Sequence, residues 1–240
     1  MLQLPSFPYT PVLGWSSTRA GIFRSCLRCY FYQYYAKYDR EIPIGRILHL
    51  KNLSTIPMTI GTGVHEILAT LLTRLQKTDR ELDRARFDQH IEASIQKLLR
   101  ATKLQEVYYK ERPAPSVEEL LDPVRQCLGN FLASERFGWV REHIHGNANC
   151  LIEPPGYGES RLRGMKIYAK VDFLFQLNGE TVILDWKTGR PDPAKHHRQM
   201  LAPSAASSPT CSPATRRSRR CRRKRNWKLW PRRWLPISSG

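Results

Sequence analysis

Apolar residues follow a helical period near the start of the chain. In residues 16–38, the side chains of Phe23, Leu27, Tyr30 and Tyr34 recur every three to four positions. This spacing predicts an amphipathic helix with one apolar face. Basic residues are interleaved with these aromatic residues, so the same helix is a candidate for contact with a polyanion.

Three further helices are predicted in the first half of the chain. They are expected from Ile60 onward, from about Glu81 to Ala101, and from Ser116 to about Phe137. Thr62 is the expected N-cap of the first of these helices. Ser116 and Glu119 have the spacing of a capping box. Pro123 is expected to disturb the last helix or to shift its start, because proline cannot donate a helical hydrogen bond.

The period changes to that of strands in the second half of the chain. Residues 139–152 fit one or two strands, and residues 163–176 and 181–186 fit two more. The last two are separated by Asn178 and Gly179, which is a strong signal for a hairpin. Helices followed by a hairpin sheet predict an α/β or α+β domain.

The composition changes abruptly at residue 201. Residues 201–240 contain 11 of the 39 Lys and Arg residues and three of the six tryptophans, and they contain no Asp or Glu. A disordered basic arm that grips nucleic acid fits this composition, and so does an out-of-frame translation. The tryptophans and the loss of acidic residues favour the second interpretation. We therefore predict one domain over residues 1–200, followed by an aberrant or disordered tail.

The net charge of +18 overstates the basicity of the predicted domain. Without the tail, the chain carries 28 basic and 21 acidic residues, a moderate excess that is consistent with a polyanionic partner. The first residues have no signal-peptide pattern, and no apolar stretch is long enough to cross a bilayer. The six cysteines form no regular framework. We therefore expect a reducing, cytoplasmic setting and no membrane partner.

Two carboxylates and a lysine are expected to meet at the hairpin. Asp172 lies inside one apolar strand, Asp185 ends the next, and Lys187 follows two residues later. Alternation along a strand puts Asp185 and Lys187 on the same face, and the hairpin brings Asp172 close to them. Such carboxylates hold Mg²⁺ or Mn²⁺, which activates water for phosphodiester hydrolysis beside a fixed positive charge. The alternative is an ordinary surface Asp–Lys pair.

Several motifs together resemble the RecB-type branch of the PD-(D/E)XK nucleases, which includes helicase-linked exonucleases and Cas4-like proteins. The motifs are Gly61…His65, Lys170-Val-Asp172 and Ile183-Leu-Asp-Trp-Lys-Thr-Gly189, preceded by an N-terminal motif at residues 25–35. The resemblance runs from residue 16 to about residue 200 in the same order. It implies an α/β fold with a restriction-endonuclease-like core, in which a mixed sheet carries a catalytic hairpin and helices flank it.

The resemblance also implies roles for individual residues. The implied metal ligands are the side chains of His65, Asp172 and Asp185 and the backbone carbonyl of Trp186. Lys187 is the implied catalytic lysine. Outside this pattern, a lone histidine on a helix is more often a core or surface residue than a ligand.

Contacts with DNA are expected at two places. Arg19, Arg24 and Arg28 lie among the aromatic residues of the first predicted helix, where solvated arginines around a buried face are the alternative. In the related nucleases, a residue matching Gln199 opens a Gln-x-x-x-Tyr motif. Position 203 is proline here, so the motif breaks close to the start of the tail. This break agrees with a frameshift or truncation that removes the final helices of the fold.

The pair Cys26-x-x-Cys29 has two interpretations. Some related nucleases hold an iron–sulfur cluster with one cysteine near this helix and three near the C-terminus. Cys211 and Cys221 lack the clustered spacing that such a site needs. We therefore expect buried thiols and no iron–sulfur cluster.

These observations predict a Mg²⁺- or Mn²⁺-dependent DNA nuclease that acts in repair, recombination or defence. Its expected substrates are single-stranded ends or unwound duplex, and the exonuclease preference and a possible helicase partner follow from the family resemblance alone. Because the motif after Gln199 is broken, an inactive DNA-binding or scaffold protein with a degenerate nuclease fold is the alternative. A third possibility is an RNA-binding protein that acts through the arginine-rich tail.

Overall fold

The computed structural model describes residues 13–38, 41–154, 158–162, 165–178, 180–189 and 192. The helices in these ranges are α1 Ser17–Ser25, α2 Leu27–Tyr34, the 3-10 helix η1 Ala36–Tyr38, α3 Ile44–Lys51, α4 Ile56–Lys77, α5 Arg84–Ala101, α6 Gln105–Tyr108, α7 Val117–Leu132 and α8 Glu135–Ile144. The strands are β1 Gly14–Trp15, β2 Leu53–Ser54, β3 Lys103–Leu104, β4 Cys150–Ile152, β5 Gly158–Leu162, β6 Met165–Ala169, β7 Phe173–Leu177 and β8 Glu180–Leu184.

The strands form small sheets. β7 pairs with β8 in antiparallel fashion, with Leu177 opposite Glu180, and β4 pairs with the other edge of β7 to give the order β4–β7–β8. Asn178 has φ 51°, the left-handed conformation that tight hairpin turns use. The predicted antiparallel pairing of these two segments is therefore confirmed. A second sheet has the order β1–β6–β5, and β2 and β3 form a short parallel pair.

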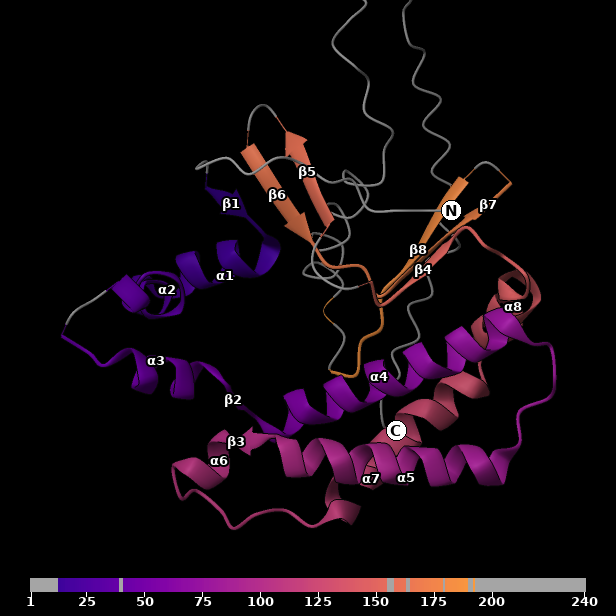
Figure 1. Ribbon diagram of the computed structural model, residues 1–240, viewed down its shortest axis with the longest axis horizontal. Coiled ribbons are helices and arrows are strands. Elements are labelled where there is room, and N and C mark those ends of the chain that lie inside the picture. The colour runs from indigo at the N-terminus through magenta and orange to yellow at the C-terminus, as the bar shows by residue number, and fades with distance from the viewer. Residues whose placement is uncertain are drawn as a thin grey trace, which may run out of the picture.

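The core is built around α4. Figure 1 shows α4 running between the helices α5 and α7 on one side and the β4–β7–β8 sheet on the other. We call α4, α5, α7 and α8 the helical layer. The buried residues of α4 are Val64, Ile67, Leu68, Leu71, Leu72 and Leu75, together with Thr59 and Gly63. Burying each large aliphatic side chain stabilises the fold by about 1.5–3 kcal/mol.

Gly63 faces side chains of α5 and α7 at close range. A Cβ atom at this position would lie only 2.6 Å from Cδ1 of Ile95, so a larger residue would force the end of the Ile95 side chain to move. Phe173 and Phe175 of β7 belong to the same buried cluster as the apolar face of α4. The helix is therefore fixed both to the helical layer and to the sheet. The whole is a mixed α/β architecture, consistent with the predicted fold class.

The start of α4 differs from the prediction. The helix begins at Ile56, and the side chain of Thr55 caps it by accepting a hydrogen bond from the Met58 amide at 3.3 Å. Pro57 lies in the first turn, where its missing N–H costs nothing. Thr62 lies inside the helix, and its hydroxyl donates to the Met58 carbonyl at 3.1 Å. The prediction of Thr62 as N-cap is therefore wrong, because an equally suitable cap lies seven residues earlier.

Two helices replace the single helix predicted over residues 116–137. The capping box is confirmed, since the Ser116 hydroxyl accepts from the Glu119 amide at 3.3 Å and the Glu119 carboxylate accepts from the Ser116 amide at 3.1 Å. Pro123 lies within α7 without ending it. Ser134 then caps α8. The strand predicted over residues 139–152 is confirmed only for β4, because the earlier part forms α8.

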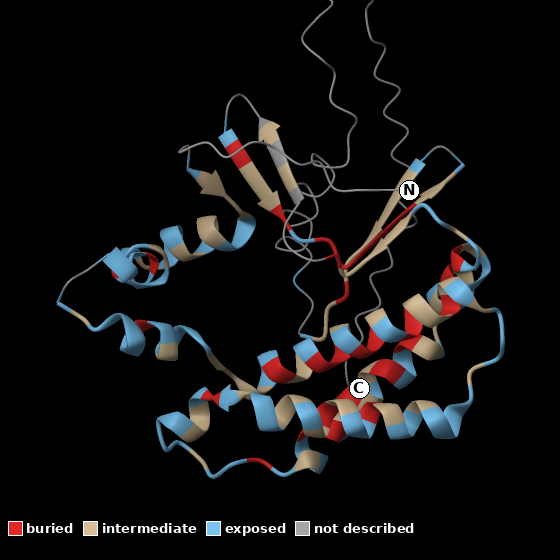
Figure 2. Ribbon diagram, in the orientation of Figure 1, coloured by how far each residue is buried: buried red, intermediate tan, exposed pale blue. Residues whose placement is uncertain are grey.

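The helix predicted over residues 16–38 is divided. At Cys26 the backbone is extended, with φ −160° and ψ 110°, and this residue separates α1 from α2. We call α1, α2, η1 and α3 the N-terminal arm. Figure 2 shows that most of the arm is exposed, in contrast to the red faces of the helical layer. The exposed large apolar residues of these elements are Phe23, Leu27, Phe31, Tyr32, Tyr38, Ile44, Leu48 and Leu50.

Candidate metal site

Three acidic residues lie at the ends of three adjacent strands. Asp172 and Asp185 are one residue beyond the paired ends of β7 and β8, and Glu153 is one residue beyond the end of β4. The Glu153 amide donates to the Asp172 carbonyl at 2.7 Å, so strand-like contact continues past β4. The sheet register therefore brings together carboxylates that are far apart in the sequence.

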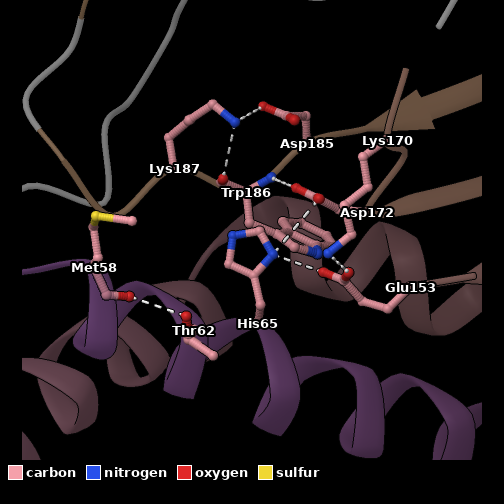
Figure 3. A network of polar contacts seen from close by, with 9 residues as sticks. All are labelled: Met58, Thr62, His65, Glu153, Lys170, Asp172, Asp185, Trp186 and Lys187. Carbon is pink, nitrogen blue, oxygen red and sulfur yellow. Dashed lines mark hydrogen bonds and ion pairs between the residues drawn. The ribbon is translucent and has the colours of Figure 1, made fainter. Parts of the chain in front are cut away.

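His65 approaches these carboxylates from α4 (Figure 3). Its Nδ1 lies 2.6 Å from Oε1 of Glu153 and 3.6 Å from Oδ1 of Asp172. One ligand atom from each of the three residues lies within 4.8 Å of the other two. An imidazole nitrogen and two carboxylate oxygens suit a divalent cation such as Mn²⁺, and carboxylates also suit Mg²⁺. The residues present therefore fit the predicted type of metal site.

The Asp172 carboxylate is buried, with 5% of the residue exposed. Burial raises its pKa to about 6; the charge of His65 lowers the pKa, and the nearby carboxylate of Asp185 raises it further. The Trp186 amide donates to Oδ2 of Asp172 at 2.8 Å, which favours the ionised form. A buried carboxylate beside other carboxylates is costly to ionise, and a cation at this position would offset that cost.

Two lysines border the acidic residues. Nζ of Lys187 is ion-paired with Oδ2 of Asp185 and lies 3.4 Å from the Trp186 carbonyl oxygen. Nζ of Lys170 lies 3.1 Å from Oε2 of Glu153. The Lys187 side chain is 30% exposed and that of Lys170 is 52% exposed, so Lys187 is the more enclosed of the two. Each ammonium is held by a different carboxylate of the site.

Asp185, also a predicted metal ligand, is not one of the three clustered ligand residues. Its carboxylate contacts Lys187, and it does not join the group whose ligand atoms lie within 4.8 Å of one another among the described residues. It still acts electrostatically on Asp172. The Trp186 ring is buried against Phe131 and Phe173 in the core, which anchors the backbone between Asp185 and Lys187.

Glu153 was missed by the sequence analysis. It lies in a segment whose prolines and glycines indicate a turn, and a turn carries no prediction of sheet register. The available signal was its position directly after the apolar run Cys150–Ile152, which matches the position of Asp185 directly after its own strand. Without knowledge that β4 pairs with β7, that signal identifies no partner.

Arg19 is engaged inside the N-terminal arm. Its guanidinium donates to the hydroxyl of Tyr30 at 2.9 Å, to that of Tyr35 at 3.2 Å and to the Gly14 carbonyl at 3.1 Å. It also lies 4.3 Å from the centre of the Tyr34 ring. These contacts link α1 to α2 and give Arg19 a structural role that its spacing did not reveal.

Of the other predicted DNA contacts, two arginines lie within the described residues and Gln199 does not. Arg24 and Arg28 are exposed on α1 and α2. Gln199 lies outside the described residues, as does the tail over residues 201–240. Each described helix is too short or too polar to cross a lipid bilayer.

The sequence of residues 14–208 matches the PD-(D/E)XK nuclease superfamily. The match covers every residue of the site described above. Comparisons with curated proteins and with solved structures gave no match.

Proposed function

Because the chain belongs to the PD-(D/E)XK nuclease superfamily, we propose that it is a Mg²⁺- or Mn²⁺-dependent deoxyribonuclease of the RecB-type branch. The observation that carries this proposal is the meeting of His65, Glu153 and Asp172 within 4.8 Å, next to an ion-paired Lys187. Nucleases of this superfamily need divalent-metal ligands and a fixed positive charge near the scissile phosphate. The three ligand residues and the lysine supply both.

His65, Glu153 and Asp172 would hold the ion, with Asp185 beside them. The ion would polarise a phosphoryl oxygen and make a bound water more acidic. The protein's own contribution is to keep these ligands in place before the ion arrives. The Trp186 amide orients Asp172, and the backbone hydrogen bond between Glu153 and Asp172 fixes the distance between β4 and β7.

Lys187 is the proposed catalytic lysine. Its ion pair with Asp185 and its contact with the Trp186 carbonyl restrict the ammonium to one side of the site. A positive charge fixed in advance stabilises the negative charge that develops on the phosphate without reorganising in the reaction. Lys170 is more exposed and is paired with Glu153. We therefore propose that Lys170 binds the phosphate backbone of the incoming DNA and takes no part in bond breaking.

The more specific parts of the proposal rest on the resemblance to the RecB-type branch. They are exonucleolytic action on single-stranded ends or unwound duplex, cooperation with a helicase, a role in DNA repair, recombination or defence, and a cytoplasmic location. Proline at position 203 in place of the branch's tyrosine supports the second candidate, an inactive DNA-binding or scaffold protein with the same fold. Both candidates predict DNA binding, and they predict opposite results for cleavage.

The test measures cleavage of end-labelled single-stranded DNA, duplex DNA and RNA in Mg²⁺, Mn²⁺ or EDTA. We expect the parent to cleave DNA with either ion, and we expect no cleavage in EDTA. Lys187→Met should lower the rate by about 100-fold or more, since removing one electrostatic stabiliser of a transition state has this size of effect. Lys97→Met, which removes an exposed lysine of α5, is the matched control and should cleave like the parent.

Binding measurements separate the ways in which the proposal fails. Calorimetric titration with Mn²⁺ should show that Lys187→Met still binds the ion, while Asp172→Asn and Glu153→Gln bind it weakly. Asp88→Asn, which removes a carboxylate from a surface ion pair with Arg125, should bind as the parent does. If the parent binds Mn²⁺ and DNA but does not cleave DNA, the nuclease proposal is refuted and the inactive DNA-binding or scaffold protein is supported.

A further inference from the structure

A pair of thiols lies at the junction of α1 and α2, outside the metal site. Cys26 is the N-cap of α2, and its Sγ accepts a hydrogen bond from the Cys29 amide at 3.4 Å. The interaction between the two thiols shifts their pKa values in opposite directions, down for Cys26 and up for Cys29. Cys29 is exposed and Cys26 is half-buried. The expectation of buried thiols at this motif is therefore wrong for Cys29, and Cys26 is only partly buried.

The spacing of the two cysteines suits a disulfide. Residues three apart on an α-helix have Cα atoms about 5 Å apart. Disulfides join residues whose Cα atoms are about 4.4–6.8 Å apart. Cys26 Sγ already lies 3.4 Å from the Cys29 amide nitrogen, so side-chain rotation without backbone movement is expected to close the bond.

We propose that Cys26 and Cys29 form a redox pair that closes reversibly into an intramolecular disulfide by exchange with a small disulfide such as glutathione disulfide. The Cys26 thiolate attacks one sulfur of the small disulfide, forms a mixed disulfide and releases one thiolate. The Cys29 thiol loses its proton and attacks Sγ of Cys26, which closes the ring and releases the second thiolate. The protein dithiol is oxidised by two electrons, and the small disulfide is reduced to two thiols.

The surroundings assign the two cysteines different roles. Hydrogen bonds from the amide and thiol of Cys29 lower the pKa of Cys26, with a smaller contribution from the amide and charge of Arg28. The hydrogen bond to Cys26 raises the pKa of Cys29. Cys26 is therefore the attacking group, and Cys29 is the resolving group. The pKa values of Cys127 and Cys150 are raised by burial, so these two serve as internal references.

A metal site does not account for this pair among the described residues. The group of three or more metal-ligating side chains found in that part of the chain is His65, Glu153 and Asp172, and it contains no cysteine. A structural zinc or iron–sulfur site needs three or four ligands. Two adjacent thiols at the start of a helix, with one accepting from a backbone amide, instead match the arrangement in which thiol–disulfide exchange is fast.

The experiment uses the full chain in glutathione buffers of increasing oxidation, followed by alkylation of free thiols, trypsin digestion and mass spectrometry. Trypsin cuts after Arg28, between the two cysteines, so a disulfide holds the peptides 25–28 and 29–37 together. We expect this linked pair, lighter by two hydrogens, to appear in oxidising buffer and to vanish with excess thiol. If the two peptides stay separate and unmodified in glutathione disulfide, the proposal is overturned.

Variants assign the steps. Cys29→Ser should keep a stable glutathione adduct on Cys26, because nothing resolves it, while Cys26→Ser should leave Cys29 mostly unreacted. Cys127→Ser, the matched control, should form the linked pair as the parent does. At pH 7, Cys26 should be alkylated faster than Cys127, because hydrogen bonding lowers the pKa of Cys26 and burial raises that of Cys127. Equal rates, or iron or zinc bound in proportion to the intact cysteine pair, would overturn the redox role.

Discussion

The helical layer and the N-terminal arm are both made of amphipathic helices, but they hold together by different means. In the layer, Leu68 and Leu72 of α4 and Ile95 of α5 are fully buried against neighbouring helices and the sheet. In the arm, Leu27 is 64% exposed and Tyr38 is 73% exposed. Cohesion in the arm instead comes from Arg19, whose guanidinium bridges α1 to the tyrosines of α2.

The contrast shows that apolar periodicity does not decide which faces become core. Both regions have it, yet only the layer has a partner for each apolar face within the described residues. The layer also carries the metal site, where His65 of α4 meets the sheet. The arm offers exposed cations and aromatic rings, which suit a charged, flexible ligand better than a protein core.

The largest expected difference between the two regions is in stability. Leu68→Ala should lower the free energy of unfolding by about 2–5 kcal/mol, since it leaves a cavity in the packed layer. Leu27→Ala, the same change on the arm, should alter it by less than about 0.5 kcal/mol. Urea unfolding followed by circular dichroism measures both. Similar losses for the two variants would show that the arm is packed as tightly as the layer.

The next effect concerns the site at the edge of the layer. The folded-state pKa of Asp172 is about 6, raised above its ordinary value of 3.8. Protonated Asp172 therefore favours the folded state below about pH 4, and this contribution is lost as pH rises through 6. In EDTA at pH 7, Asp172→Asn should raise the free energy of unfolding by on the order of 2 kcal/mol.

The pH dependence supplies the control for Asp172→Asn. The gain should shrink toward zero near pH 4, where the parent is protonated as well. Asp88→Asn, which alters an exposed ion pair with Arg125, should change stability by less than about 1 kcal/mol at either pH. A loss of stability in Asp172→Asn at pH 7 would mean that the carboxylate is already compensated without an ion.

A smaller effect is expected at the centre of the arm. Arg19→Ala removes three hydrogen bonds and the contact with the Tyr34 ring, so α1 should open more readily. Hydrogen exchange in residues 17–34 should speed up by about tenfold, corresponding to about 1.4 kcal/mol of local stability. Exchange in α4 should not change. If exchange in α4 accelerates equally, the arm and the helical layer unfold as one cooperative unit.

The smallest effect separates two kinds of arginine within the arm. If exposed Arg24 and Arg28 neutralise phosphates, replacing either with alanine should reduce the salt dependence of single-stranded DNA binding by about 0.7 in the log–log slope. Arg19→Lys keeps the charge inside the tyrosine cluster and should leave that slope unchanged. Fluorescence anisotropy over a range of salt concentrations gives the slopes. If all three variants show the slope of the parent, the arm does not contact DNA phosphates.

The sequence predicted those parts of the fold that depend on neighbours along the chain. The capping box at Ser116 and the pairing across Asn178 are local and are confirmed. The strand predicted through Trp139 is wrong, because Ser134 caps a new helix whose Val140 and Ile144 pack into the core. A short apolar run fits either period, and tertiary packing decided between them.

The site shows the same difference between features set by neighbouring residues and features set by contacts between separate elements. Asp172, Asp185 and Lys187 were identified because they belong to two apolar runs joined by one hairpin and to the residues beside them. Glu153 needed the pairing of β4 with β7, and the role of Arg19 needed the packing of α1 on α2. Both depend on contacts between separate elements, which spacing within one element does not encode.

The backbone at Glu153 has a consequence for the lifetime of the protein. Glu153 has φ 38°, a left-handed conformation that costs a residue with a side chain about 1–3 kcal/mol. With ionised Asp172 buried next to it, this corner adds to the free-energy cost of the metal-free fold. An ion bound only to the folded state, at a hundred times its dissociation constant, adds about 2.7 kcal/mol of stability. On the proposed function, divalent-ion supply would therefore govern how fast proteases remove the protein, as well as how fast it cuts DNA.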